Sequence, residues 1–238
     1  MKKVVMITGA SKGLGRALAI AFAQAGYKLA ICARGKETLT KVQSEIEQLG
    51  GEVIAVAADV SIEADVERFV SITELEYGQI DVLINNASIF GPGPSLLLDY
   101  PVNKFQNVLH VNIMNPFFVT RRVLPGMLTK GSGSIINVTS EAGKTGFSEW
   151  GAYGVSKFGL EGMTEIWADE LEGTGVVMNM VDPGEMDTDM HKVAVPDCDY
   201  ELQRPEDVMG VFFYLAETKA DNGKRFEAGI YNESRKTT

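Results

Sequence analysis

The sequence predicts a single α/β domain in which a mostly parallel, seven-stranded sheet is doubly wound, with helices on both faces. Three observations predict this fold class. Short apolar runs alternate with longer amphipathic stretches along the whole chain. The short runs are apolar on both sides, as the strands of a parallel sheet covered on both faces must be. A glycine-rich turn follows the first run, at the place where such sheets bind ligands.

The first half of the chain supplies four strands and three helices. Apolar runs predict strands at residues 4–8, 29–33, 53–57 and 82–85. The amphipathic stretches between them predict helices at residues 13–25, 37–49 and 64–77. Gly50 and Gly51 end the second helix, because glycine readily adopts the backbone conformation that stops a helix.

The second half continues this alternation. It predicts strands at residues 134–139, 176–181 and 225–231, and helices at 102–128, 152–171 and 205–217. We expect the long helix to bend near Pro116, since proline interrupts helical hydrogen bonding. Residues 184–204 are irregular, and residues 232–238 form a polar tail. Because no linker or repeat is visible, residues 1–238 are interpreted as one domain.

Composition and charge exclude several classes of function. The 238 residues are 45% apolar and 23% charged, which is typical of a globular protein with one well-filled core. The net charge of −10 argues against nucleic acid as the main partner, because duplex binding needs clustered Lys and Arg. No apolar run approaches the roughly 20 residues of a membrane span, so no membrane partner is expected.

The two cysteines predict the redox environment. Cys32 and Cys198 lie far apart and outside any metal-ligand pattern. We therefore expect two free thiols in the reducing cytoplasm in preference to a disulfide, and no metal site. Lys2 and Lys3 precede a short apolar stretch that superficially resembles a signal peptide. That stretch leads into glycines, so it is interpreted as the first strand.

The glycine-rich turn has the sequence Thr8-Gly9-Ala10-Ser11-Lys12-Gly13-Leu14-Gly15. Glycine lets a backbone turn sharply and approach a pyrophosphate, which the free N–H groups of a helix N-terminus attract. A purely structural turn is the alternative, but three glycines in the first strand-to-helix turn favour a bound cofactor. The spacing is T-G-x-x-x-G-x-G, which differs from the common G-x-G-x-x-G pattern.

With this spacing the sequence resembles the classical short-chain dehydrogenase/reductase (SDR) family, and the resemblance runs through nearly the whole chain. It implies a Rossmann-type fold, a nicotinamide dinucleotide cofactor and a small-molecule carbonyl or alcohol substrate. Within the turn, the cofactor contacts that it implies are Gly9, Ser11, Lys12, Gly13, Leu14 and Gly15.

The end of the second strand indicates which dinucleotide is bound. NAD sites usually place an acidic residue about 20 residues past the glycines, to bind the ribose hydroxyls. This chain has Ala33 there, followed by Arg34, whose guanidinium suits a 2′-phosphate. Lys12 stands where similar enzymes have a second basic residue. Each could be a solvated surface charge, but together they predict NADP(H) in preference to NAD(H).

Two further motifs match the family near the adenine and the sheet edge. Asp59 and Val60 follow the third strand, where the family contacts the adenine; capping of the next helix is the alternative for Asp59. The segment Asn85-Asn86-Ala87-Ser88 matches the N-N-A-G of the family except at Ser88. The resemblance makes Asn86 and Ala87 cofactor contacts.

A third motif follows the sixth strand. The segment Asp182-Pro183-Gly184-Glu185-Met186-Asp187-Thr188 resembles the N-P-G-x-x-x-T of the family. The resemblance places Pro183, Gly184 and Met186 against the nicotinamide, with Thr188 reaching the carboxamide or the phosphates. Asp182 departs from the Asn of the family.

A tyrosine and a lysine carry the predicted chemistry. Tyr153 and Lys157 are four residues apart, which places them on one face of a helix. A free phenol has a pKa of about 10, and a nearby ammonium favours the phenolate, so we expect Lys157 to lower the pKa of Tyr153. This spacing is common by chance. Ser140 strengthens the interpretation, because it ends a strand at the distance from Tyr153 that the family shows.

The resemblance assigns a role to each of four residues. Ser140 donates to the substrate carbonyl oxygen, and Tyr153 exchanges a proton with it. Lys157 lowers the pKa of Tyr153 and bonds the nicotinamide ribose, and Asn112 positions a water in a proton relay. For Asn112, a helix-kinking device beside Pro116 is the alternative.

The substrate lid of the family falls at residues 185–204, and its shortness indicates an open pocket or a modest substrate. Phe90, Phe147, Trp150 and Met190 are candidate lining residues, which favours an apolar or aromatic carbonyl compound. His191 lies in the lid and is interpreted as a surface residue.

The sequence therefore predicts an NADP(H)-dependent oxidoreductase that reversibly reduces a ketone or aldehyde to an alcohol. An epimerase or dehydratase of the extended branch is disfavoured, because such chains carry a larger C-terminal domain. A catalytically silent, dinucleotide-sensing binding protein is the alternative from another class. The resemblance also implies a homodimer or homotetramer formed through the long helix and the Tyr153 helix, since the last segment lacks the usual Gly-Gly ending.

Overall fold

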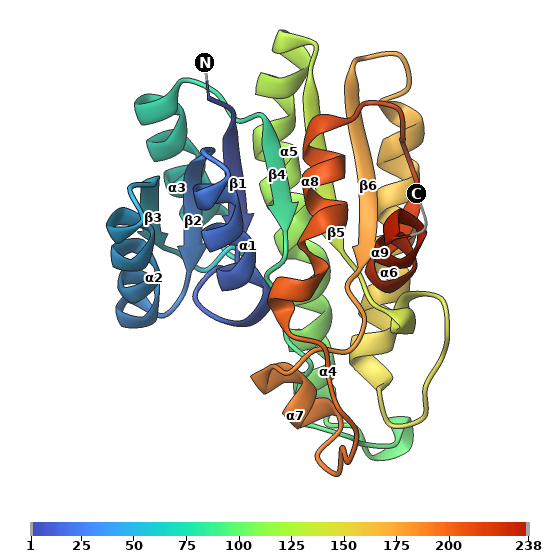
Figure 1. Ribbon diagram of the computed structural model, residues 1–238. Coiled ribbons are helices and arrows are strands. Elements are labelled where there is room, and N and C mark those ends of the chain that lie inside the picture. The colour runs from blue at the N-terminus through green and yellow to red at the C-terminus, as the bar shows by residue number, and fades with distance from the viewer. Residues whose placement is uncertain (1, 237–238) are drawn as a thin grey trace.

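The computed structural model describes residues 2–236, which contain one seven-stranded sheet. Its strands are β1 (Val4–Thr8), β2 (Lys28–Ala33), β3 (Glu52–Ala57), β4 (Val82–Asn85), β5 (Gly133–Val138), β6 (Val176–Asp182) and β7 (Arg225–Glu227). The strand order is β3-β2-β1-β4-β5-β6-β7, and every neighbouring pair is parallel. The predicted doubly wound α/β fold is confirmed, and the order reverses between β1 and β4 (Figure 1).

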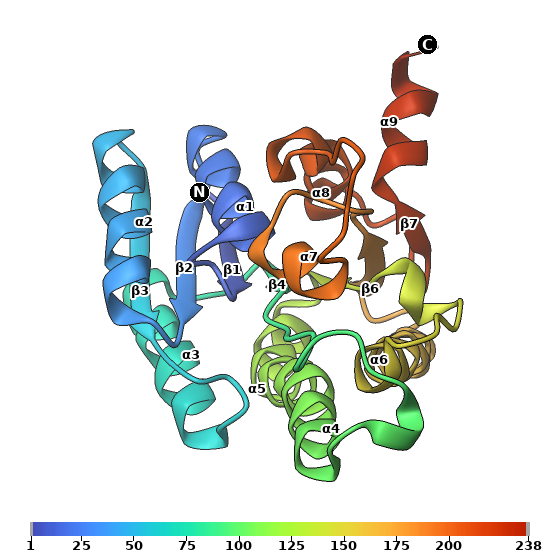
Figure 2. The ribbon, with the colours of Figure 1, turned by 90° about the horizontal axis from the view of Figure 1, so that it is seen from below.

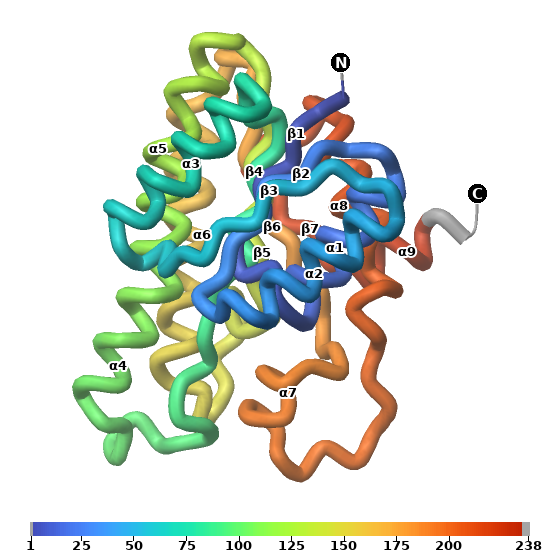
Figure 3. The backbone as a smooth tube through the Cα atoms, turned by 90° about the vertical axis from the view of Figure 1, so that its left-hand side faces the viewer, coloured from blue at the N-terminus to red at the C-terminus, as the bar shows by residue number. Residues whose placement is uncertain are grey.

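Helices cover both faces of the sheet (Figure 3). One face carries α1 (Gly13–Gln24), α2 (Lys36–Gln48) and α8 (Met209–Glu217), and the other carries α3 (Glu63–Tyr77), α4 (Val102–Leu109), α5 (Asn115–Lys130) and α6 (Gly151–Glu170). Short 3₁₀ turns lie at Leu97–Asp99, Glu141–Gly143 and Pro205–Val208. The short helix α7 (Asp189–Ala194) covers the carboxyl ends of the strands, where ligands bind in such sheets, and lies in front of them in Figure 2.

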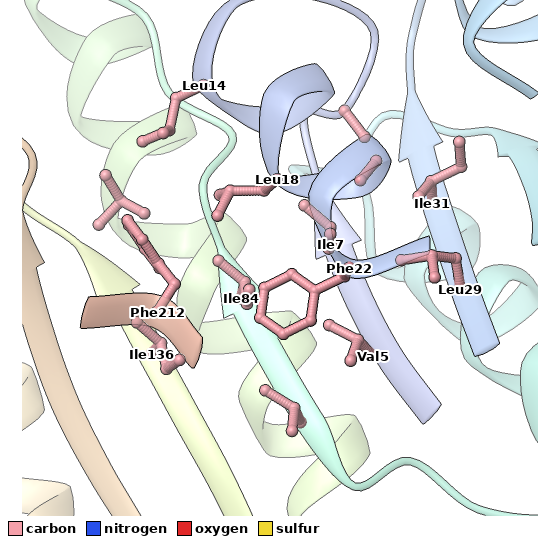
Figure 4. Packing of buried hydrophobic residues seen from close by; sticks show 14 of the residues in the cluster. Val5, Ile7, Leu14, Leu18, Phe22, Leu29, Ile31, Ile84, Ile136 and Phe212 are labelled. Atoms are coloured by element: carbon pink, nitrogen blue, oxygen red, sulfur yellow. The ribbon is translucent and has the colours of Figure 1, made fainter. Parts of the chain in front are cut away.

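Two buried clusters, one on each side of the sheet, hold these layers together. Successive strand residues point to opposite faces, so Ile7 joins one cluster and Met6 the other. Figure 4 shows Phe22 of α1 and Phe212 of α8 close to Ile84 of β4, all in the first cluster. Burying an aromatic ring of this size contributes about 1.5–3 kcal/mol. Strands apolar on both sides are therefore what this layered packing requires.

The predicted long helix is interrupted earlier than expected. A π-helical turn, His110–Met114, separates α4 from α5. The predicted bend near Pro116 is thus replaced by a turn that precedes this proline, which is the second residue of α5. A π turn widens the helix by one residue and commonly lies at functional sites. The turn contains the buried Asn112, whose contacts are described below.

The end of the chain also differs from the prediction. The strand predicted at 225–231 is only three residues long, and Ala228–Lys236 form helix α9. Ala228 is buried in the first cluster, and the Tyr231 ring lies 5.6 Å from that of Tyr214 on α8. These contacts turn the chain back onto α8 and end the strand. Of the predicted polar tail, residues 237–238 lie outside the described residues.

Residues 2–236 contain neither a membrane-spanning helix nor a cluster of metal ligands. No helix in this range combines the length and the apolar character needed to cross a bilayer. Within the same range, no group of three or more His, Cys, Asp and Glu side chains is arranged to hold a metal ion. Cys32 is buried and Cys198 half-buried, and both are free thiols.

Candidate active site

A cleft of about 1150 Å³ opens at the carboxyl ends of the strands. It exceeds the usual volume of a small-molecule pocket, about 300–1,000 Å³, and so has room for a dinucleotide together with a substrate. Its walls come from the turns after β1 to β6 and from the lid helix α7. All the predicted cofactor contacts line the cleft, as do Ser140, Tyr153 and Lys157. Asn112 does not.

The glycine-rich turn forms the floor of this cleft. Gly9 has a positive φ of 70°, and a Cβ there would lie 2.7 Å from the Cα of Ala87. A Cβ at Gly15 would collide with the carbonyl oxygen of Gly9, so both positions require glycine. The N-cap residue Lys12 makes no side-chain cap bond to α1. The first N–H groups of α1 therefore remain for an anionic ligand, and the turn fits a pyrophosphate.

The Asn86 segment holds the glycine turn in place. The Nδ2 of Asn86 donates to the carbonyl oxygens of Thr8 (2.9 Å) and Gly9 (3.1 Å). The hydroxyl of Thr8 accepts from the backbone N–H groups of Asn86 and Ala87. These four bonds join the ends of β1 and β4, the two strands between which the order of the sheet reverses. Ser88, the departure from N-N-A-G, also lines the cleft.

Basic and acidic groups lie close together at the end of the cleft beside β2. Arg34 is exposed there, directly after β2. The ammonium of Lys12 donates to Asp189 at the start of α7, at 2.8 Å, so Lys12 ties the glycine turn to the lid. Asp59 accepts from the backbone N–H and the hydroxyl of Ser61, and the helix N-cap is Ile62. Asp59 thus forms a turn before α3 and does not cap the helix itself.

Ser140, Tyr153 and Lys157 lie together at the deep end of the cleft. Ser140 follows β5, and its Oγ accepts from the N–H of Ala142 at 3.2 Å and is near enough to Tyr153 to act on the pKa of its phenol. Tyr153 is 7% and Lys157 3% exposed. The ammonium of Lys157 donates to the carbonyl oxygen of Val138 at 2.8 Å and lies 5.4 Å from the centre of the Tyr153 ring.

Burial shifts the pKa of both Tyr153 and Lys157. Burial raises the pKa of Tyr153 to about 12, although the bond from Ser140 acts in the opposite direction. Burial also lowers the pKa of Lys157 to about 8, against the influence of Asp182 and Glu161. Lys157 is not among the groups that shift the pKa of Tyr153 here, so its predicted lowering of that pKa stays a prediction. Desolvation of the buried phenol outweighs the effects of its neighbours.

Asn112 lies in the π turn and is held by hydrogen bonds to two other segments of the chain. Its Oδ1 accepts from the N–H of Ile89, and its Nδ2 donates to the carbonyl oxygen of Ile89 and to Ser156, each at 2.9 Å. The side chain is 2% exposed. It therefore clamps the loop after β4 against the junction of α4 and α5 and against α6. All its polar atoms are occupied by these bonds, which fits the helix-kinking alternative.

The comparisons with known proteins agree with this geometry. Residues 3–199 match the family model described as short chain dehydrogenase. The chain belongs to the short-chain dehydrogenase family. It is 37% identical over 221 residues to a 3-oxoacyl-[acyl-carrier-protein] reductase of Synechocystis, which covers 90% of this chain and 89% of that protein. As a short-chain dehydrogenase, the protein is an oxidoreductase.

Solved structures give the same assignment. A protein from Pseudomonas syringae described as a short chain dehydrogenase superposes with a TM-score of 0.89 and 35% identity, covering 95% of this chain and 94% of that one. A Shigella flexneri relative complexed with NADP has a TM-score of 0.88 and 28% identity over 95% and 97% of the chains. A 3-ketoacyl-(acyl-carrier-protein) reductase from Brucella melitensis complexed with NADH has a TM-score of 0.88 and 27% identity. The match covers 94% of this chain and 96% of that one.

The sequence did not predict the positions of several side chains in the site of this dehydrogenase. His191, predicted at the surface, is 8% exposed and lines the cleft, because α7, the helix that carries it, covers one side of the cleft. Its Nε2 lies 3.3 Å from Glu185. Asp182 is bonded by Arg225 of β7, 43 positions away. The signal in the sequence for this pair was the departure of Asp182 from the Asn of the family motif.

The predicted substrate wall of the dehydrogenase lies along the cleft. Phe90, Phe147, Trp150 and Met190 all line it. The rings of Phe90 and Trp150 lie 5.2 and 5.9 Å from that of Tyr153, and Phe147 lies 5.4 Å from Trp150. The aromatic wall thus packs against the ring of Tyr153, and it favours an apolar ligand there.

Proposed function

We propose that this protein is an NADP(H)-dependent carbonyl reductase that reversibly converts a ketone or aldehyde to an alcohol. One observation carries the proposal: Ser140, Tyr153 and Lys157 lie together at the deep end of a cleft whose other end is a glycine turn suited to a pyrophosphate. Hydroxyl donors beside a bound carbonyl are what its reduction requires.

A bound reduced dinucleotide supplies the hydride, and the chain's own residues manage the proton. The hydroxyl of Ser140 donates to the carbonyl oxygen of the substrate and stabilises the charge that develops on it. Tyr153 gives its phenolic proton to the same oxygen, so C=O becomes C–O–H and a phenolate remains. The ammonium of Lys157, 5.4 Å from that ring, stabilises the phenolate.

The raised pKa of Tyr153 suits reduction. With a pKa of about 12, the phenol keeps its proton at neutral pH and is ready to act as an acid. In the oxidation direction the same group must first lose that proton. We therefore expect reduction to proceed readily near neutral pH and oxidation to become faster as the pH rises.

The NADP(H) preference is supported by Arg34, and by Ala33 in place of the acidic residue of NAD sites. Residues of the glycine turn, the Asn86 segment and the Pro183–Thr188 segment would hold the dinucleotide, since all line the cleft. For the substrate, the aromatic wall supports a neutral, apolar carbonyl compound. The names of relatives add β-keto thioesters to the compounds worth testing.

The test is to follow oxidation of NADPH and NADH with a panel of aldehydes, diketones, quinones and β-keto thioesters. Tyr153→Phe should bind NADPH within about twofold of the wild type but lose about 10²–10⁴-fold in turnover, because the proton donor is removed. Tyr77→Phe, on α3 and outside the cleft, is the matched control.

Two outcomes would count against the proposal. Full activity of the Tyr153→Phe variant would refute the mechanism. Tight NADPH binding by the wild type without turnover on any carbonyl compound would favour the dinucleotide-sensing alternative.

A further inference from the structure

Arg225, on the last strand, is the centre of a partly buried network of charges beside Ser140. Its guanidinium donates to the carboxylates of Asp182 (2.8 Å), Glu161 (3.1 Å) and Glu227 (2.7 Å). It also donates to the backbone carbonyl oxygen of Ser140 at 3.1 Å. Its side chain is only 16% exposed, while those of Asp182 and Glu161 are 8% and 12% exposed. Arg225 does not line the cleft.

These bonds join the three elements that carry the proposed chemistry. Ser140 ends β5, Asp182 ends β6 directly before the Pro183–Gly184 turn, and Glu161 lies one turn beyond Lys157 on α6. Asp182 in turn accepts from the N–H of Gly184 at 2.9 Å. Thr139, next to Ser140, donates to the same oxygen of Glu161 that Arg225 binds. One guanidinium thus fixes the relative positions of β5, β6 and α6.

The network also sets the charge near Tyr153. Asp182 raises the pKa of both Tyr153 and Lys157, and Glu161 acts on Lys157 in the same direction. Two further charged groups lie beside this network. Glu141 of the 3₁₀ turn after Ser140 has its carboxylate 3.6 Å from Arg225, and Lys144, directly after that turn, pairs with Glu227. The guanidinium therefore compensates a carboxylate that would otherwise act unscreened on the proton donor.

We propose that Arg225 is a positioning residue of the active site, which fixes the main chain at Ser140 and screens Asp182 from Tyr153. This inference rests on the proposed carbonyl-reductase function. Arg225 touches neither the substrate nor the dinucleotide in this role, and it acts through Ser140 and Asp182.

The first variant is Arg225→Gln. We expect kcat for reduction to fall about tenfold or more, because Ser140 loses its anchor, while KM for NADPH stays within about twofold. The negative charge of Asp182 then favours the protonated phenol. The pH profile of alcohol oxidation should therefore move to higher pH, by on the order of one unit. Arg121→Gln, an exposed arginine of α5, is the matched control.

Two further variants separate charge from geometry. Arg225→Gln combined with Asp182→Asn removes the charge that needs screening, so the pH profile should return to that of the wild type. Arg225→Lys keeps the charge but loses the forked contacts, so its pH profile should stay near that of the wild type while kcat falls. The Arg225→Lys variant also tests the positioning role if the Arg225→Gln variant does not fold.

The outcomes distinguish the possible roles. An Arg225→Gln variant with a lower Tm but an unchanged kcat and pH profile would overturn the proposal and leave Arg225 a stabilising residue only. A crystal structure of this variant gives a readout that needs no turnover. A displaced Ser140 carbonyl would support the positioning role even if the wild type reduces no carbonyl compound in the panel, whereas an unmoved Ser140 would overturn it.

Discussion

The proposed NADP(H) preference depends on single side chains at the end of the cleft beside β2. Arg34 is exposed there, and Ala33 before it offers no carboxylate to repel a phosphate. The second predicted basic residue, Lys12, is paired with Asp189 at 2.8 Å, and both side chains are about 70% exposed. Such exposed pairs contribute little to stability, so Lys12 can exchange Asp189 for a phosphate at small cost.

Arg34→Asp tests this assignment. We expect NADPH affinity to fall by about tenfold to a hundredfold, because a favourable charge-assisted bond is replaced by repulsion, while NADH affinity changes by less than about threefold. Titration of each dinucleotide by fluorescence measures both values. The control is Lys36→Asp at the first residue of α2, which makes the same change of charge two residues away from Arg34. Equal losses for the two dinucleotides would contradict the NADP(H) assignment.

At the level of elements, the π turn between α4 and α5 depends on one buried side chain. Asn112 makes three hydrogen bonds, two of them to the backbone of Ile89 after β4. The loop that carries Ile89 and Phe90 forms part of the cleft wall. A local irregularity in a helix thus fixes the position of the aromatic wall beside Tyr153.

Asn112→Ala should therefore destabilise the protein as well as reduce activity. Removing the amide leaves the N–H and carbonyl of Ile89 without these partners, which we expect to cost about 2–4 kcal/mol in the free energy of unfolding. Urea denaturation measures this difference. Asn107→Ala, at an exposed position in α4, should cost less than about 0.5 kcal/mol. Equal stability of the two variants would show that the Asn112 bonds do not hold the turn.

At the scale of the whole molecule, apolar side chains remain exposed on the face formed by α4, α5 and α6. Val155, Phe158 and Ile166 of α6 are 47%, 47% and 62% exposed, and their spacing puts them on one side of the helix. Val102 at the start of α4 is 72% exposed. Figure 2 shows these helices side by side at one face of the molecule. A patch of this kind is typical of a subunit interface.

We expect a homodimer or homotetramer that uses this face. Phe158→Glu should shift the protein to the monomer in sedimentation velocity runs at micromolar concentration, because it places a charge in an apolar interface. Leu75→Glu, 89% exposed on α3, should leave the oligomer unchanged. A wild-type protein that is monomeric at these concentrations would contradict the prediction. The α9 helix, which replaces most of the predicted last strand, lies away from this face of the molecule (Figure 2).

The sequence by itself determined the fold class, the glycine turn and the Tyr153–Lys157 pair, because each is written in neighbouring residues. An apolar run, a glycine pattern or a four-residue spacing predicts the same local structure whatever distant segments pack against it. The tertiary structure alone decided the contacts that join distant segments: Arg225 with Asp182, Lys12 with Asp189, and the lid helix α7 with the rest of the cleft wall. It also decided the pKa of Tyr153, since burial depends on everything that packs around a side chain and on no residue type by itself.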